Sequence, residues 1–258
     1  MELITFDLLN KFSKIAHFCT TRQGGVSVGN YASMNMSPFS GDNVEHQSEN
    51  LNLLKKKLNS TDLIIPFQTH GTEIGIINED FIQKNFAERA DLLNGVDALI
   101  TKEPNVCIGV TTADCVPLIF YDPQLEVIAV AHAGWRGTCG RIAEKVVKRM
   151  QEEFGSHPQH INVVIGPSIS GTVYNVGNEL IDNFSSAGFP VAEIFNTNNE
   201  LIYLDLWKAN QWLLESMGVP ADHIQISEIC TYTQHEKFFS ARRLGLKSGR
   251  MLSAIMLK

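Results

Sequence analysis

The hydrophobic positions of this chain fall into short runs separated by polar turns, which predicts a protein with more strands than helices. The clearest case is a pair of apolar runs, 116–121 and 127–131, that flank Asp122-Pro123. Because Asp-Pro is a common turn opening, these two runs are expected to pair as a β-hairpin. Other strands are expected at 16–20, 63–67, 74–77, 97–101, 106–110, 162–165, 224–226 and 251–257.

Helical periodicity is confined to a few stretches. Helices are expected over 45–58, over about 139–154, near 178–187, and from an Asp205 cap to a stop at Gly218. Because strands and helices do not alternate strictly, the expected fold class is α+β with mixed sheets rather than a doubly wound fold. The sequence has no internal repeat or linker-like change of composition, so residues 1–258 are expected to form a single domain.

The predicted hairpin also brings reactive side chains together. If Pro123 and Gln124 form a two-residue loop, Cys115 lies directly opposite His132. Directly paired side chains leave the same face of a sheet, with Cβ atoms about 4.5–5.5 Å apart. A thiolate and an imidazole at that distance suit either a metal site or a Cys–His dyad. A longer loop would shift this register by a residue or two, and Pro at the first loop position disfavours the two-residue turns.

A metal site needs a third ligand, and His70 is the best candidate because it follows the expected strand 63–67 in a polar loop. Catalytic zinc keeps three protein ligands and one open position. One alternative is a Cys115 nucleophile with His132 as its base, as in cysteine hydrolases. Another is copper oxidation. None of the eight histidines form a His-x-His pair, which disfavours a multicopper centre, although a His/Cys site can capture copper.

Three arginines are candidate contacts for an anionic or polar substrate: Arg22, Arg136 and Arg242. Arg136 precedes the helix expected from residue 139, and a helix N-terminus attracts anions. Each arginine also has a structural alternative. These alternatives are an exposed turn for Arg22, stacking on Trp135 for Arg136, and the solvated exit of a strand for Arg242.

Composition narrows the classes of partner. With 28 acidic and 21 basic residues, the formal net charge is −7, which disfavours binding to a nucleic-acid backbone but allows a local basic pocket. No apolar run reaches the ~20 residues needed to cross a bilayer, and the first residues do not resemble a signal peptide. The five cysteines are scattered and odd in number, so they are expected to be free thiols in a cytoplasmic protein.

Several motifs carry a resemblance that covers nearly the whole chain. They are Thr20–Ser27, Gln68–Gly71, Asp97–Thr101, Thr112–Pro117, His132–Gly137, Ile165–Ile169 and Phe238–Arg243. In these motifs the chain resembles the YfiH-like family, whose members are variously called laccase-domain, polyphenol oxidase or purine nucleoside phosphorylase proteins. The combination is highly specific.

The resemblance implies a four-layer α/β/β/α sandwich with mixed sheets, similar to the catalytic domain of cytotoxic necrotizing factor. It also implies a zinc site with His70, Cys115 and His132 as ligands. The implied substrates are phosphate and purine nucleosides, with phosphorolysis of adenosine, inosine, guanosine and methylthioadenosine and hydrolytic deamination of adenosine. Zinc lowers the pKa of a bound water to about 7, which suits deamination. A monomer is the expected state.

The chain departs from the family pattern at two positions. Leu51 follows Asn50 where the family commonly has an arginine, so one basic substrate contact is expected to be lost or replaced. Ala241 stands where the C-terminal motif usually has tyrosine, which is expected to change the wall of the pocket. The general acid or base is unassigned, because Asp114 is next to a proposed ligand but has no defined direction.

Overall fold

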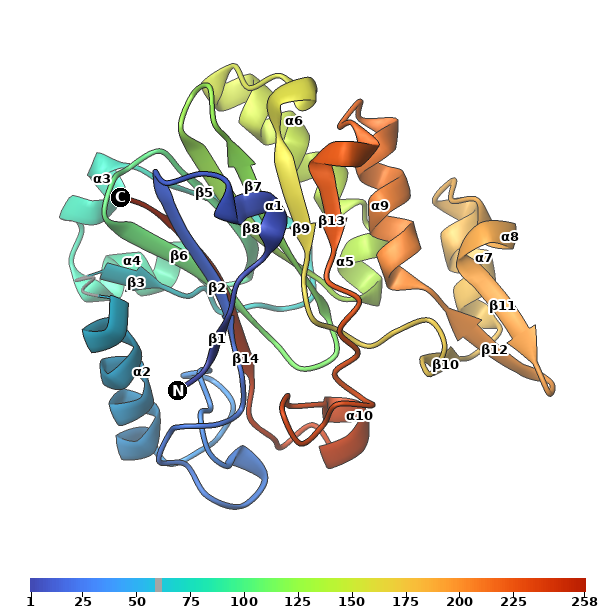
Figure 1. Cartoon of the computed structure of the whole chain (residues 1–258), viewed down its shortest axis with the longest axis horizontal. Coiled ribbons are helices and arrows are strands. Elements are labelled where there is room, and N and C mark those ends of the chain that lie inside the picture. The colour runs from blue at the N-terminus through green and yellow to red at the C-terminus, as the bar shows by residue number, and fades with distance from the viewer. Residues whose placement is uncertain (59–61) are drawn as a thin grey trace.

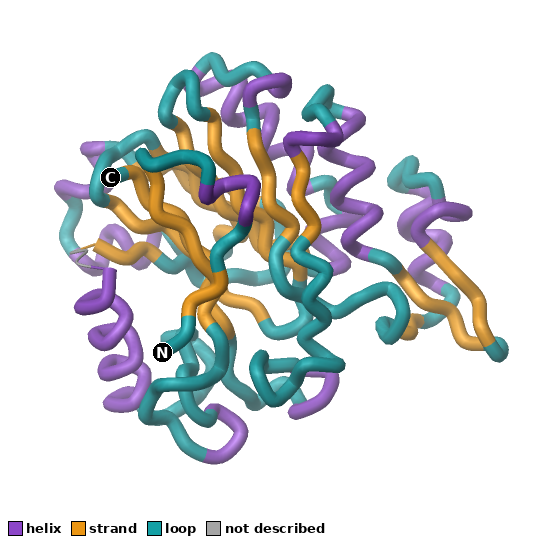
Figure 2. Tube along the Cα trace, viewed as in Figure 1, coloured by secondary structure: helices purple, strands orange, loops and turns teal. Residues whose placement is uncertain are grey.

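Strands that are apolar along their whole length form the centre of the molecule. The structure is a computed structural model that describes residues 1–58 and 62–258 (Figures 1 and 2). The larger sheet runs in the order β13 (Ile224–Ile226), β9 (Asn162–Ile165), β7 (Val116–Asp122), β8 (Val127–Ala133), β5 (Val96–Thr101), β4 (Glu73–Ile77). The second runs in the order β1 (Leu3–Ile4), β2 (Ile15–Thr20), β14 (Met251–Leu257), β6 (Val106–Thr112), β3 (Asp62–Ile64). Both sheets are mixed, because each contains parallel and antiparallel pairs.

The two sheets pack face to face because their central strands are buried on both sides. Every residue of β6, β7, β8 and β14 is buried. One face of β7 and β8 packs through Ile119, Ile128 and Val130 against Ile108 and Ile255 of the second sheet. Because these strands are buried on both faces, the outer face of each sheet must also be covered.

Amphipathic helices provide that cover. The outer face of the larger sheet packs against α5 (Trp135–Cys139), α6 (Ile142–Phe154), α7 (Glu179–Ser186) and α9 (Leu206–Ser216). The outer face of the second sheet packs against α2 (Val44–Leu58). Helices therefore flank the paired sheets on both sides (Figure 2). This arrangement confirms the predicted α+β fold with an α/β/β/α order of layers, while the likeness to cytotoxic necrotizing factor stays a prediction.

The remaining α-helices and strands are short. They are α1 (Asp7–Asn10), α3 (Glu79–Gln83), α4 (Phe86–Leu92), α8 (Val191–Ile194), α10 (Ala241–Leu244) and a small sheet of β10 (Asn175–Val176), β12 (Leu201–Leu204) and β11 (Phe195–Asn198). The small sheet extends from one end of the molecule (Figure 1). Within the described residues, no helix combines the length and apolarity that a bilayer crossing requires.

The predicted hairpin forms, but the predicted register of its two strands was wrong. A four-residue turn over 123–126 joins β7 to β8, so His132 pairs with Pro117, and Val116 pairs with Ala133. Cys115, directly before β7, is therefore displaced by two positions from the predicted pairing. Because side chains alternate between the faces of a strand, a shift of two keeps Cys115 and His132 on the same face.

Two other expectations also need correction. The helix expected over 139–154 begins earlier, at Trp135, and is divided by Arg141, whose backbone is left-handed with φ 64°. The strand expected over 63–67 ends at Ile64, because Pro66 and Phe67 already belong to the loop that leads to the site. The cap at Asp205 is confirmed, since its side chain accepts the backbone N–H of Lys208 at 3.0 Å.

Candidate metal centre

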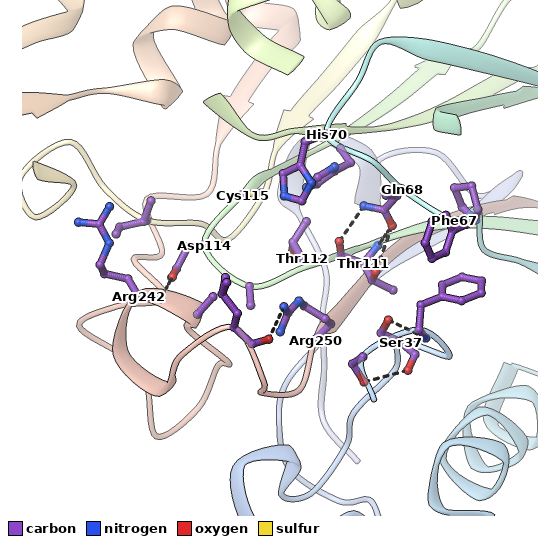
Figure 3. Close-up of a pocket in the computed structure, with 18 of the residues that line it drawn as sticks. Ser37, Phe67, Gln68, His70, Thr111, Thr112, Asp114, Cys115, Arg242 and Arg250 are labelled. Atoms are coloured by element: carbon purple, nitrogen blue, oxygen red, sulfur yellow. Dashed lines mark hydrogen bonds between the residues drawn. The ribbon is translucent and has the colours of Figure 1, made fainter. Parts of the chain in front are cut away.

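Three segments that are distant in sequence converge on one small volume. His132 lies on β8, Cys115 lies at the entry to β7, and His70 lies in the loop between β3 and β4. One ligand atom from each, the Cys115 Sγ and an imidazole nitrogen of each histidine, lies within 4.8 Å of the other two. The imidazole rings of His70 and His132 meet edge to face, with centroids 4.7 Å apart. The structure therefore brings together all three predicted ligands, of which His70 and Cys115 are labelled in Figure 3.

A buried carboxylate holds two of these segments in place. Asp97, fully buried on β5, accepts the backbone N–H groups of Thr69, His70 and Gly71 at 3.2, 3.1 and 2.7 Å. The same carboxylate bonds the Nδ1 atom of His132 at 2.7 Å. This bond leaves the Nε2 atom of His132 as the nitrogen available to a metal, the usual role of a carboxylate behind a histidine ligand. Sequence reasoning placed Asp97 in a motif but gave it no role.

The backbone around the three side chains is shaped for close approach. His70 has a left-handed backbone with φ 63°, which turns the three N–H groups of the loop toward Asp97. Gly134 lies directly against the site: a Cβ there would sit 3.0 Å from the Cys115 Sγ and 3.2 Å from the Cδ2 of His70. Both distances are shorter than ordinary contacts, so the lack of a side chain at Gly134 leaves room for the donor atoms.

The charges of the site favour a thiolate. Burial alone would raise the pKa of Cys115, but the charge of His132 and hydrogen bonds to His132 and His70 lower it to about 6. Burial alone would lower the pKa of His132, but the charge of Cys115 and the hydrogen bond to Asp97 raise it to about 9. Burial would likewise raise the pKa of Asp97, yet His132 and the backbone N–H groups hold it below its ordinary value. The thiolate is the form of cysteine that binds metals.

The three side chains open onto a cavity of about 550 Å³. Its wall contains both polar and apolar side chains from the N-terminal, central and C-terminal parts of the chain (Figure 3). They are Ser37, Phe39, Ser40, Pro66, Phe67, Gln68, His70, Thr111, Thr112, Ala113, Asp114, Cys115, His132, Ile169, Tyr174, Ala241, Arg242, Leu246 and Arg250. A cavity of this size with a few convergent polar groups is typical of a small-molecule site.

Of the three predicted substrate arginines, Arg242 lines this cavity. Its Nη1 donates to the backbone oxygen and the Oδ1 of Asn175, at 3.0 and 2.8 Å. Its guanidinium also lies 5.1 Å from the centre of the Tyr174 ring. Arg242 is therefore held at one end of the cavity, and its contact with a substrate stays a prediction.

Arg22 and Arg136 are not among the described residues that line the cavity. Arg22 donates to the backbone oxygens of Ala32 and His235, at 3.0 and 2.7 Å, so its guanidinium joins two loops. Arg136 lies inside α5 rather than before a helix, and its guanidinium is 4.3 Å from the centre of the Trp135 ring. These contacts match the structural alternative for Arg136, and they give Arg22 a loop-bridging role.

Asp114 points away from the metal site. Its carboxylate accepts the hydroxyls of Thr231 and Ser240, at 2.7 and 3.0 Å, and the backbone N–H of Arg242 at 2.7 Å. It therefore anchors the C-terminal segment that forms part of the cavity wall. Of the two departures from the family pattern, Ala241 does line the cavity, whereas Leu51 packs with α2 against the second sheet.

Sequence reasoning missed Arg250, which also lines the cavity. The residue belongs to no motif identified in the sequence, and it lies directly before β14. The only signal in the sequence was its position at the start of an apolar strand, which does not reveal where a side chain points.

The fold and this site together define an α+β protein with a candidate transition-metal centre in the wall of a small-molecule cavity. The chain belongs to the family described as multi-copper polyphenol oxidoreductase laccase, whose family model matches residues 16–258. This membership confirms the resemblance found in the sequence motifs.

Comparisons with individual proteins agree with this family membership. The chain is 43% identical to a purine nucleoside phosphorylase of Bacteroides thetaiotaomicron, covering 99% of this chain and 96% of that protein. It is 38% identical to adenosine deaminase RL5 of an unknown prokaryotic organism, over the full length of both. Among solved structures, YfiH of Bacillus licheniformis superposes with a TM-score of 0.92 at 32% identity, covering 99% of this chain and 96% of that one. The chain is therefore an enzyme, as predicted.

Proposed function

We propose that this protein is a zinc-dependent enzyme of purine nucleosides. The proposed reactions are phosphorolysis of adenosine, inosine, guanosine and methylthioadenosine, and hydrolytic deamination of adenosine. The observation that carries the proposal is the convergence of His70, Cys115 and His132 in a cavity wall. The relatives named as a purine nucleoside phosphorylase and an adenosine deaminase support the substrate class.

The donor set fits zinc. Two imidazole nitrogens and one thiolate are common zinc ligands, with bonds of about 2.0–2.1 Å to nitrogen and 2.3 Å to sulfur. Donor atoms already within 4.8 Å of one another require only small side-chain movements to reach those bonds. Three protein ligands leave one position for water or substrate, as in catalytic rather than structural sites.

Some residues of the chain position the metal ligands, and others line the cavity that receives the substrate. When bound, zinc supplies a Lewis acid that lowers the pKa of a coordinated water to about 7. Asp97 fixes the ring of His132 and the loop that carries His70. The cavity wall at Phe67 and Tyr174 presents aromatic surface that suits a purine base. Asp114 is committed to the C-terminal segment, which gives it a structural role rather than that of the proton carrier.

The proposal is tested by metal analysis and product analysis together. Purified protein is expected to contain about one zinc ion per chain and to convert adenosine to inosine without phosphate. With phosphate it is expected to release adenine as well. Chelation and Cys115→Ala are both expected to abolish these conversions, and a zinc-free wild type with full activity would contradict the proposal.

A second candidate, a cysteine hydrolase, is favoured by the closeness of Cys115 to His132. The two candidates differ at His70, which a Cys–His dyad does not need but a three-ligand metal site does. A hydrolase would keep its activity in a chelator and in His70→Ala, and would lose it when Cys115 is alkylated. The zinc enzyme is expected to lose both metal and activity in His70→Ala.

Copper-dependent polyphenol oxidation, the activity in the family's description, is less well supported. A multicopper centre needs several clusters of ligands, and the described residues contain a single group of His, Cys, Asp or Glu side chains suited to a metal. Because a His/Cys site also binds copper, the metal analysis should quantify both ions.

We also propose a cytoplasmic, monomeric protein, in keeping with five cysteines that are all free thiols.

A further inference from the structure

Arg250 carries a positive charge into the cavity without a matching carboxylate. No Asp or Glu oxygen among residues 1–58 and 62–258 lies within 4.0 Å of its guanidinium. Burial lowers its pKa, while the charges of Cys115 and Asp114 act in the opposite direction. Asp114 is already hydrogen-bonded elsewhere, and Cys115 belongs to the candidate metal site. A half-buried cation in this position is stabilised by an anion that enters the cavity.

The hydrogen bonds of Arg250 fix its direction. Its Nη1 donates to the backbone oxygens of Ser248 and Gly249, at 2.6 and 3.0 Å, and its Nη2 donates to that of Leu246 at 3.0 Å. An arginine has five N–H groups. Among the described residues, the Nε–H and one Nη2–H have no acceptor, so the guanidinium keeps donors that can bind an oxyanion.

A second polar group in the same wall is unpaired. Thr112, on β6, is almost completely buried and lines the cavity, and its hydroxyl has no hydrogen-bond partner in the part of the chain that the structure describes. In Figure 3, Thr112 lies between Arg250 and His70, whereas Arg242 lies at the far end of the cavity. A buried hydroxyl without a partner and an uncompensated cation in the wall of one cavity indicate a place for a ligand with several oxygens.

We propose that Arg250, with the hydroxyl of Thr112, binds the inorganic phosphate used in phosphorolysis. This inference rests on the proposed function and assigns its phosphate subsite. An oxygen of hydrogen phosphate forms a bond to C1′ of the nucleoside as the bond from C1′ to N9 breaks. The electron pair of that bond leaves with the purine, N9 takes the proton of the phosphate, and ribose 1-phosphate and free purine result. Arg250 is a binding residue in this step and holds the phosphate charge.

The test compares two reactions in one cavity, because phosphorolysis needs phosphate and deamination does not. Arg250→Gln is expected to raise KM for phosphate by about tenfold or more, since it removes a charged pair of hydrogen bonds. The loss in phosphorolysis is expected to exceed any loss in adenosine deamination by about tenfold. Arg250→Lys keeps the charge but not the paired edge, so it should recover part of the phosphate affinity. Thr112→Val should raise KM for phosphate less, because it removes one neutral donor.

Arg243→Gln is the matched control, because Arg243 is exposed, lies over the Tyr232 ring and is outside the described cavity wall. It should leave KM for phosphate unchanged. If Arg250→Gln lowered phosphorolysis and deamination equally, the residue would only support the loop 246–249, and the proposal would be wrong. An unchanged KM for phosphate would also overturn it.

Direct binding separates this proposal from the proposed function. Calorimetry with inorganic phosphate should show binding to the wild-type protein and about tenfold weaker binding to Arg250→Gln, whether or not a nucleoside is converted. Wild-type protein that turns over no nucleoside would refute the proposed function but leave this comparison decisive. Equal affinities of the two proteins for phosphate, or no binding by the wild type, would refute the subsite.

Discussion

At the scale of single residues, the sequence identified the donor atoms but not the residues that hold them. His70, Cys115 and His132 stand out because their chemistry is visible in the side chain. Asp97 and Gly134 act through close tertiary contacts between β5, β8 and the His70 loop, and those contacts depend on register and loop path. Spacing along a single chain does not specify such contacts, so neither residue was assigned a role beforehand.

Asp97→Asn tests the positioning role of the buried carboxylate. The change removes the charge behind His132 and replaces one acceptor of the three backbone N–H groups by an amide that cannot accept. Zinc affinity, measured by competition with a chromophoric chelator, is expected to fall roughly 10–100-fold. Asp122→Asn is the control, because Asp122 is equally buried but serves the turn after β7. Wild-type zinc affinity in Asp97→Asn would contradict this role.

Gly134→Ala tests whether the site needs open space beside the thiol. The backbone of Gly134 has φ −66° and ψ 174°, which alanine adopts without strain, so the effect comes from the added Cβ alone. That Cβ would lie 3.0 Å from the Cys115 Sγ. Zinc affinity should fall about tenfold or more while the thermal midpoint stays near that of the wild type. An alanine variant that binds zinc as tightly as wild type would show that the thiol moves freely aside.

At the scale of elements, most strands could be predicted because their apolar runs are bounded by clear turns. The hairpin of β7 and β8 was predicted with the wrong loop length, since the sequence 122–126 does not distinguish a two-residue turn from a four-residue one. Cys115 and His132 were still predicted on the same face of the sheet, because the error in pairing was two residues. The β11–β12 hairpin was missed, because Asn196, Thr197 and Asn198 are polar and exposed and so lack the apolar alternation of a strand.

β2 carries a pH-dependent contact with the N-terminal segment. Burial lowers the pKa of His17 to about 4, and the charge of Lys258 lowers it further. The neutral imidazole accepts the Phe6 N–H on its Nε2 at 2.9 Å. The unfolded chain, with an ordinary histidine pKa of about 6.5, takes up the proton first. The contribution of His17 to stability is therefore complete above pH ~6.5 and is lost as pH falls through 4.

Urea unfolding at a series of pH values checks this contact. Between pH 7 and pH 4, the wild-type free energy of unfolding should lose on the order of 2 kcal/mol more than that of His17→Gln. Glutamine keeps an acceptor for the Phe6 N–H but does not titrate, which makes it the matched variant. Parallel pH curves for the two proteins would show that His17 makes no such contribution.

At the scale of the whole molecule, two sheets bring together segments that are far apart in the sequence. The pairing of β14 with both β2 and β6 joins the C-terminal strand to the N-terminal and central parts of the chain, which places Arg250 in the cavity wall. Composition and periodicity gave the α+β class, but the order of layers came from the family resemblance. Long-range strand order depends on which apolar faces meet, and local patterns do not encode that choice.

The central claim is that His70, Cys115 and His132 surround one zinc ion. X-ray absorption at the zinc edge of purified protein measures this most directly. The expected first shell has one sulfur at about 2.3 Å and two nitrogen atoms of imidazoles at about 2.0–2.1 Å, with a further light atom. Cys115→Ser should remove the sulfur signal. A zinc shell without sulfur in the wild type, or one unchanged by Cys115→Ser, would contradict the claim.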